Sequence, residues 1–304
     1  MLTTDMVSML RCPTSPRDEL RAEINRWEGK KIIEGKLICD KLNLSYPIQV
    51  GVPDLIPYEK LTNYEWRMWK DHLDGFQARR EQRIKESNRV INKLGSKSKP
   101  QKAFAQFTGI TKGTILDIGC GPGKFRFHFD SEAVKYCGID PIVLPEVEDF
   151  PFVRALAEYI PFEDNTFTDV VVISAMDHFR NLDIFFKEVV RVLKPEGKFH
   201  ILQSIHEIKG PITAAKLLTH KIKDALEDRE TKVKNPEAPK HLAEFSKSSL
   251  FETVTHYFNI VATDEYSYSW YSPRKMFLTL SPKNEQLVHD KTTDNVKNAK
   301  IQSL

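Results

Sequence analysis

Three closely spaced glycines and an acid near them carry the clearest chemical pattern of the chain. Residues 114–118 form an apolar, β-branched run that ends in Gly-Cys-Gly-Pro-Gly at 119–123, and Asp117 stands two residues before the first glycine. The run predicts a strand that leads into a helix-like segment, and the glycines predict a turn that approaches a ligand closely, because any Cβ would block the approach and the positive φ. The spacing differs from the G-x-G-x-x-G of dinucleotide sites, because Lys124 occupies the position of the last glycine.

A second acid follows at the end of a second predicted strand. Residues 136–139 are that strand, and Asp140 ends it. An acid roughly 20 residues after a nucleotide-binding loop accepts hydrogen bonds from the two ribose hydroxyls. A strand, a glycine turn and an acid would fit many nucleotide-binding α/β domains, so the later segments decide between them.

Three later segments extend the pattern. Residues 157–172 run from Ala-Glu-Tyr-Ile-Pro-Phe into an apolar strand, residues 182–193 have helical periodicity, and residues 194–202 begin with Lys-Pro-Glu-Gly. With the glycine turn, this series resembles the ordered motifs of the class I S-adenosylmethionine (SAM) methyltransferases, in particular the methyltransferase-11-like domain, over about residues 114–204. The resemblance implies an α/β fold with a seven-stranded, Rossmann-like sheet. SAM has a cationic sulfonium and an amino-acid end in place of a pyrophosphate, which suits an acid beside the turn.

The same resemblance implies which residues bind the cofactor. Asp117, Gly119, Cys120 and Gly121 would line the methionine end of SAM. Asp140 would bind the ribose. The adenine would lie against Pro141, Ala157 and Glu158. After the fourth strand, Ser174 and Ala175 would lie beneath the cofactor. Many relatives carry an Asp just before this Ala, where the present chain has Leu156, so backbone atoms would have to replace that adenine contact.

Two adjacent polar residues follow the fourth predicted strand, where family members approach their substrate. His178 could act as a general base, since the ordinary pKa of histidine is near neutral, and Asp177 could orient it or act alone. The alternative is that both residues cap the next helix, a position that favours Asp. Because adjacent side chains point in different directions, we expect at most one of them to be catalytic.

The N-terminal segment 1–58 has a different character. Cys12 and Cys39, with the Pro- and Gly-rich strand pattern of 44–57, resemble the small zinc-ribbon domain that activates several methyltransferases. In that family each cysteine opens a C-x-x-C pair, but the second partners here are Ser15 and Leu42, so two thiolates would not close a tetrahedral zinc site. We therefore predict a degenerate ribbon-like α+β domain without a metal, in which both cysteines are small buried hydrophobes.

The rest of the chain divides by composition. Residues 59–99 predict a helical linker whose basic and aromatic side chains are interleaved with acids, which favours a solvated helix over an RNA-binding face. Residues 100–282 would be the methyltransferase domain, with a lid-like insertion at 205–249, and residues 283–304 would be a disordered tail.

Bulk composition excludes several classes of protein. There are 45 Lys and Arg against 42 Asp and Glu, a net charge of +3, which gives no case for nucleic acid or a membrane surface. No apolar run approaches the ~20 residues of a membrane span, and residues 1–8 lack the basic and apolar regions of a secretion signal. Four dispersed cysteines fit a reducing, cytoplasmic compartment.

These patterns predict SAM-dependent methylation, with S-adenosylhomocysteine (SAH) as product, of an oxygen, nitrogen or carbon of a small metabolite or a glycan or natural-product precursor. One alternative is an rRNA or tRNA methyltransferase, and another is a non-catalytic SAM-binding scaffold. A second copy or a protein partner could bind through the ribbon-like domain. The chain has neither the Pro-Pro-Tyr motif of amino-group methyltransferases nor a Pro-Cys nucleophile, and the sequence does not name the acceptor.

Overall fold

The structure is a computed structural model that describes residues 2–62, 70, 74–75, 98–143, 150–205, 244–267 and 274–283. Most of the predicted linker 59–99 and of the lid-like insertion 205–249 lies outside these residues, and so does the predicted tail apart from Lys283.

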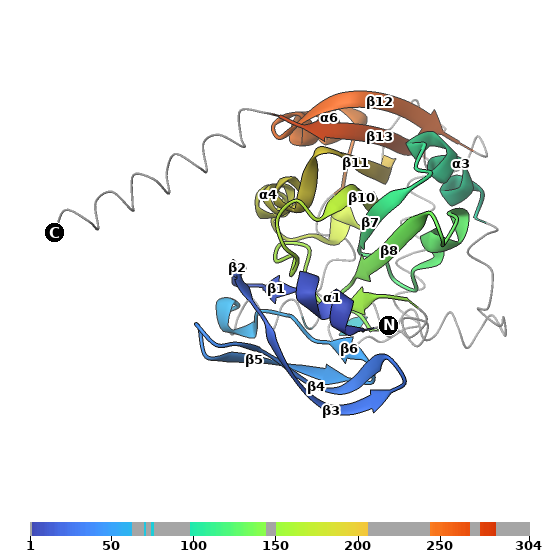
Figure 1. Cartoon of the computed structure of the whole chain (residues 1–304). Helices are drawn as coiled ribbons and strands as arrows, with labels where there is room; N and C mark the ends of the chain where they lie inside the picture. The colour runs from blue at the N-terminus through green and yellow to red at the C-terminus, as the bar shows by residue number, and fades with distance from the viewer. Residues whose placement is uncertain are drawn as a thin grey trace.

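A seven-stranded sheet forms the centre of the molecule (Figure 1). Its strands lie in the order β12-β13-β11-β10-β7-β8-β9, and β13 runs antiparallel to its two neighbours while the other pairs are parallel. The strands are β7 (Gly113–Ile118), β8 (Val134–Ile139), β9 (Phe152–Val153), β10 (Phe167–Ile173), β11 (Leu193–Ile205), β12 (Phe258–Tyr266) and β13 (Arg274–Pro282). The predicted seven-stranded α/β fold is confirmed, and the order reverses between β7 and β10, where α/β sheets bind ligands.

Helices cover both faces of this sheet, which explains why its central strands are apolar on both sides. The run Val170–Val172 in β10 is completely buried. Helix α3 (Lys99–Thr108) packs Phe104 against Phe277 and Phe125 on one face. Helices α4 (Leu182–Val192) and α6 (Lys247–Thr255) bury their apolar residues in the main core on the other face.

The segment after the glycine turn differs from the expected helix. It is a short 3-10 helix, η3 (Lys124–His128), which begins after Gly123 in the left-handed conformation. Strand β8 already starts at Val134, so the connection leaves little room for a longer helix. The guanidinium of Arg126 instead holds the turn by donating to the carbonyls of Pro122 and Gly123.

Residues 2–57 form a separate layer that we call the N-terminal module. Helix α1 (Thr4–Met9) and the β1–β2 hairpin are followed by a four-stranded antiparallel sheet in the order β3-β4-β5-β6, and a 3-10 helix η1 (Tyr58–Lys60) comes next. The strands are β1 (Arg11–Cys12), β2 (Ser15–Glu19), β3 (Arg21–Glu28), β4 (Lys31–Cys39), β5 (Leu44–Gln49) and β6 (Val52–Pro53). Exposed ion pairs such as Arg21–Asp40 and Glu23–Lys36 cover one face, while Leu37 and Ile48 join the main core.

The module lies beside one edge of the seven-stranded sheet (Figure 1), and backbone hydrogen bonds join the two. Arg154 N donates to Pro53 O over 3.0 Å, and Leu55 N donates to Arg154 O over 2.8 Å, directly after β9. Leu10 forms a second bridge with Phe162. The two sheets thus share one continuous core.

Cys12 and Cys39 are fully buried in this module as free thiols. Burial raises the pKa of Cys39, and the neighbouring Cys12 thiol raises it further. Ser15 bonds to Asp18, which pairs with Lys41. Within the described ranges, no three His, Cys, Asp or Glu side chains gather closely enough to hold a metal ion, so a zinc ribbon is not shown.

Within the described ranges, no helix is both long enough and apolar enough to cross a lipid bilayer.

Candidate functional site

The glycine turn packs directly against the loop that follows β10. Gly119 has φ 70°, and a Cβ added to it would lie 2.5 Å from the Cβ of Ala175. A side chain at position 119 is therefore excluded both by conformation and by contact. The adjacent Ser174 takes a left-handed φ of 52°, uncommon for a residue with a side chain and typical of functional loops. The turn and two predicted cofactor residues thus meet at the reversal point of the sheet.

Asp117 is a buried acid at the end of β7, with only 2 % of its surface exposed. The hydroxyl of Tyr136 donates to its Oδ2 over 2.5 Å, and its Oδ1 has no hydrogen-bond partner among the described residues. Burial raises the pKa of Asp117 to about 7, an effect that the bond from Tyr136 opposes and the charge of Asp140 strengthens. A buried carboxylate with an open oxygen is suited to a cationic ligand.

Asp140 connects the glycine turn to the loop after β8. Gly121 N donates to Asp140 Oδ2 over 2.9 Å, and Ile142 N donates to Asp140 Oδ1 over 2.8 Å. Both oxygens of this carboxylate thus accept from backbone amides. The residue predicted to hold a ribose also shapes the turn before any ligand binds.

Two predicted residues beside this acid have structural contacts of their own. The Cys120 side chain lies against Gly138, where a Cβ would be 2.5 Å from its sulfur. Burial, with the charges of Asp117 and Asp140, raises the pKa of the Cys120 thiol well above its ordinary value, which favours the protonated thiol. The carbonyl of Pro141 accepts a bond from Arg154 Nε over 3.0 Å.

Glu158 ties two loops together. Its Oε1 accepts from the backbone N–H groups of Arg180 and Asn181 over 2.7 and 3.1 Å, and its Oε2 has no hydrogen-bond partner within the described residues. Burial raises the pKa of this carboxyl. The predicted adenine loop, which includes Ala157, is thereby fastened to the segment in front of α4.

The departure at Leu156 has a structural explanation. Leu156 is 1 % exposed and packs against the fully buried Ile56 of the N-terminal module, with Leu61 and Tyr159 beside them. An Asp at this position would place a charge inside that apolar contact. The position at which many relatives carry an Asp toward the adenine is here part of the apolar contact between the N-terminal module and the seven-stranded sheet.

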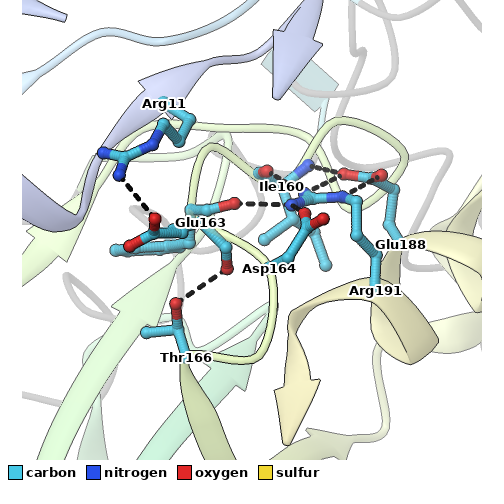
Figure 2. A network of polar contacts seen from close by, with 8 residues as sticks. Arg11, Ile160, Glu163, Asp164, Thr166, Glu188 and Arg191 are labelled. Atoms are coloured by element: carbon cyan, nitrogen blue, oxygen red, sulfur yellow. Dashed lines mark hydrogen bonds and ion pairs between the residues drawn. The ribbon is translucent and has the colours of Figure 1, made fainter. Parts of the chain in front are cut away.

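Arg191 of α4 fixes the loop between β9 and β10 (Figure 2). Its guanidinium donates to the carbonyls of Ile160 and Phe162 over 2.7 and 2.6 Å, and it pairs with Glu188 and Asp164. The module reaches the same loop, because Glu163 N donates to Met9 O over 3.1 Å, and Arg11 pairs with Glu163 over 2.8 Å. One loop therefore touches both α4 and the module.

The candidate catalytic residues Asp177 and His178 lie in a 3-10 helix, η5 (Met176–His178), directly after Ala175. The alternative that they cap the next helix is wrong. The N-cap of α4 is Asn181, whose side chain accepts from Ile184 N over 3.0 Å. Both residues are half-buried at the carboxyl edge of the sheet, near the glycine turn. Their catalytic role stays a prediction.

Sequence reasoning missed two polar residues at the same edge. Lys275 begins β13 and donates a hydrogen bond to Ser204 Oγ at the end of β11. A lysine at the start of an apolar strand gives no signal of its own, and only the pairing of β13 with β11 brings it to this edge.

A comparison with protein families matches residues 116–201 to the methyltransferase domain. The ubiquinone/menaquinone biosynthesis C-methyltransferase UbiE of Haemophilus ducreyi is 30% identical over 122 residues, 35% of this chain and 47% of that protein. Sterol 4-C-methyltransferase strm-1 of Caenorhabditis elegans is 34% identical over 104 residues, 30% of each chain. Arginine-hydroxylase NDUFAF5 of Mus musculus is 39% identical over 92 residues, 28% of this chain and 26% of that protein.

These matches cover less than half the length of each of the three curated relatives. Among solved structures, the Burkholderia thailandensis 1,6-didemethyltoxoflavin-N1-methyltransferase with bound S-adenosylhomocysteine has a TM-score of 0.50 and 15% identity, covering 86% of this chain and all of that one. This likeness extends to the fold. Residues 116–201 therefore match the methyltransferase domain, and the sheet that holds them has the seven-stranded order expected of class I SAM-dependent methyltransferases.

Proposed function

We propose that the whole chain is a SAM-dependent methyltransferase whose acceptor is a small molecule. The observation that carries the proposal is Asp117 with its open, buried oxygen, beside a glycine turn that Asp140 holds in shape. These residues fit a cationic nucleoside cofactor, because they combine a buried acid with one open oxygen, a turn that lets the backbone approach closely, and a second acid at the sequence spacing typical of ribose binding.

SAM, when bound, supplies a methyl group on a sulfonium, which is reactive toward nucleophiles without help from the protein. The residues of this chain would bind and orient it. Asp117 and the amides of the glycine turn would take the methionine end, and Asp140 the ribose. Pro141, Ala157 and Glu158 would border the adenine, and Ser174 and Ala175 would lie beneath the cofactor.

The acceptor would approach from the side of η5. Asp177 or His178 could take a proton from it, although a methyl transfer to an already ionised or carbon nucleophile needs no base on the protein. Two considerations support a small acceptor. The net charge is close to balanced, and UbiE and strm-1 carry names of small-molecule methyltransferases.

The first experiment is a calorimetric titration of SAM and SAH into the wild type, Asp140→Ala and Asp130→Ala. Asp130 is an exposed acid that also accepts a backbone bond, from Glu132 N, and is the matched control. We expect Asp140→Ala to weaken binding about 100-fold, because two backbone donors and the ribose lose a charged acceptor. Asp130→Ala should bind like the wild type.

The second experiment incubates the protein and labelled SAM with a metabolite extract and, separately, with bulk RNA. Label in a small-molecule fraction that depends on Asp140 supports the proposal. Label in RNA alone would replace it with an RNA methyltransferase. Absence of SAM binding by the wild type would favour a scaffold that has lost the cofactor.

A further inference from the structure

Lys275 and Ser204 lie on one face of the sheet at its carboxyl edge. They are paired residues on neighbouring antiparallel strands, and directly opposite residues project from the same face. The ammonium of Lys275 donates to Ser204 Oγ. Both side chains are half-buried, so the lysine is not one of the freely solvated charges of the surface.

The pair is close to the candidate cofactor turn. Gly119 touches Ala175, and Asp177 follows two residues later in η5. The negative charge of Asp177 acts on Lys275 across the edge. Three elements that are distant in sequence, β11, β13 and η5, therefore bring a hydroxyl, an ammonium and a carboxylate together on the acceptor side.

Among the residues that the structure describes, the charge of Lys275 is incompletely satisfied. Burial lowers the pKa of Lys275, and the opposing effect of Asp177 does not restore it. An ammonium has three N–H donors, and Ser204 is the one hydrogen-bond acceptor that Lys275 has within the described residues. An additional anionic acceptor would stabilise a half-buried ammonium that has N–H donors without partners.

An aromatic side chain stands next to Lys275 in the sheet. Tyr266 of β12 is the paired residue of Lys275 on its other side, and the Tyr266 ring stacks on Phe277 with 5.7 Å between centroids. Tyr266 is half-buried, whereas Phe277 is 1 % exposed and belongs to the core. A planar ligand with a negative oxygen would find both an apolar and a charged contact here.

We propose that Lys275 and Ser204 bind an oxyanion of the methyl acceptor, either a carboxylate or an ionised hydroxyl. This assignment rests on the proposed methyltransferase function and names the chemical class of its substrate. Lys275 is a specificity-determining residue in this assignment, and no proton or methyl group passes through it.

The test measures binding of small probes to protein saturated with SAH. Calorimetry compares benzoate with benzamide, and 4-nitrophenolate with 4-nitroanisole, so each anion has a neutral partner of similar shape. We expect the wild type to bind at least one anion about ten-fold more tightly than its partner, as for a charge-assisted hydrogen bond. Which anion is preferred distinguishes a carboxylate from an ionised hydroxyl.

Three variants complete the test. Lys275→Met should lose the preference for the anion, and Lys275→Arg should keep most of it. Lys198→Met is the matched control, because Lys198 is a half-buried lysine on the same face of β11, about 20 Å from Ser204 at six residues of strand rise. Binding of SAH by each variant verifies that it is folded.

The pH dependence of benzoate binding gives a second test, because a lysine with a purely structural role would not change it. Benzoate stays ionised above neutral pH, so its affinity should fall only as Lys275 loses its proton, at a pH below the ordinary lysine value of about 10.4. Lys275→Arg should abolish that fall, since arginine stays charged.

The outcomes separate the two proposals. A wild type that does not bind SAH overturns the proposed function, and the oxyanion assignment fails with it. A wild type that binds SAH but prefers neither anion overturns the assignment alone. An anion preference that survives in Lys275→Met also overturns it, because the charge would then come from another residue.

Discussion

The two ends of the sheet's carboxyl edge are held in different ways. At the predicted adenosine end, over β8 and β9, Asp140 bonds to backbone amides, and the N-terminal module packs from outside through Asp54 and Ile56. At the acceptor end, over β10, β11 and β13, charged side chains face one another across the edge. The first end is fixed by contacts within the chain itself, whereas the proposed acceptor would complete the second. A binding site can therefore reveal its cofactor in motifs and still leave its substrate unnamed.

The largest effect is expected from Leu156→Asp, which introduces the acid that many relatives carry at this position. If Leu156 belongs to the joint with Ile56, as its burial indicates, the substitution should cost about 3 kcal/mol of unfolding free energy by burying a carboxylate. Urea denaturation measures the loss. A variant with wild-type stability and tighter SAH binding would instead place residue 156 against the adenine.

The next largest effect concerns the methionine end. The pKa of Asp117 is raised to about 7, so the carboxyl becomes protonated as the pH falls below that value. A cationic cofactor prefers the ionised form, and SAM affinity should fall about ten-fold per pH unit below 7 until the pKa of the complex is reached. Calorimetry between pH 5.5 and 8 measures this slope.

Asp117→Asn provides the control for the pH dependence of SAM binding, because the SAM affinity of this variant should be weak and independent of pH in this range. The ligand-free variant should also be more stable than the wild type at pH 8. An acid whose pKa is raised by folding loses stability as the pH rises from its unfolded value of 3.8 to about 7, and the amide avoids that loss. A slope that persists in the amide variant would show that another group titrates.

A smaller effect is expected from Asp54→Asn, which weakens the contact between the N-terminal module and Arg154 at the predicted adenosine end. Arg154 donates to Asp54 Oδ2 over 2.7 Å and to Pro141 O over 3.0 Å, so it connects the module to the residue predicted to flank the adenine. We expect SAH affinity to drop about five-fold, or about 1 kcal/mol, for the loss of one partly buried charged bond.

Asp40→Asn is the matched control for the Asp54→Asn variant. Asp40 also pairs with an arginine, Arg21, but its side chain is 63% exposed on the outer face of the module. Its replacement should leave SAH binding unchanged. Equal losses in both variants would mean that the module acts through general stability.

The smallest effect should come from Glu163→Gln. The Glu163 side chain is 56% exposed, and water screens its pair with Arg11, so the change should cost below about 0.5 kcal/mol. The loop remains held by the backbone bond to Met9 and by Arg191. Urea unfolding at low and high salt would detect any larger contribution.

Local chemistry made the central part of the fold predictable. The buried strand before the glycine turn, the acid at the end of β8 and the apolar face of α4 follow from periodicity and from glycine's conformational freedom. Helix η3 was shorter than expected, because the distance to the next strand sets its length. The alternative that Asp177 and His178 cap α4 was wrong, because Asn181 occupies that position.

Contacts between distant segments were not predictable. Leu156 meets Ile56 only because the module packs on the edge of the sheet, and Lys275 meets Ser204 only because β13 is antiparallel to β11. The left-handed Ser174 likewise has no signal in its residue type. Site residues that lie in one continuous motif are readable from sequence, whereas those that depend on strand order are not.

The backbone bonds from residues 53–55 to Arg154 have a consequence for solubility. An uncovered edge strand exposes a row of amides and carbonyls to which a second chain can add its own strand. A truncated chain that begins at Ser98 would keep every predicted cofactor residue and lose this cover from the end of β9. The module therefore also protects the sheet against self-association, and a catalytic fragment without it would be prone to aggregate.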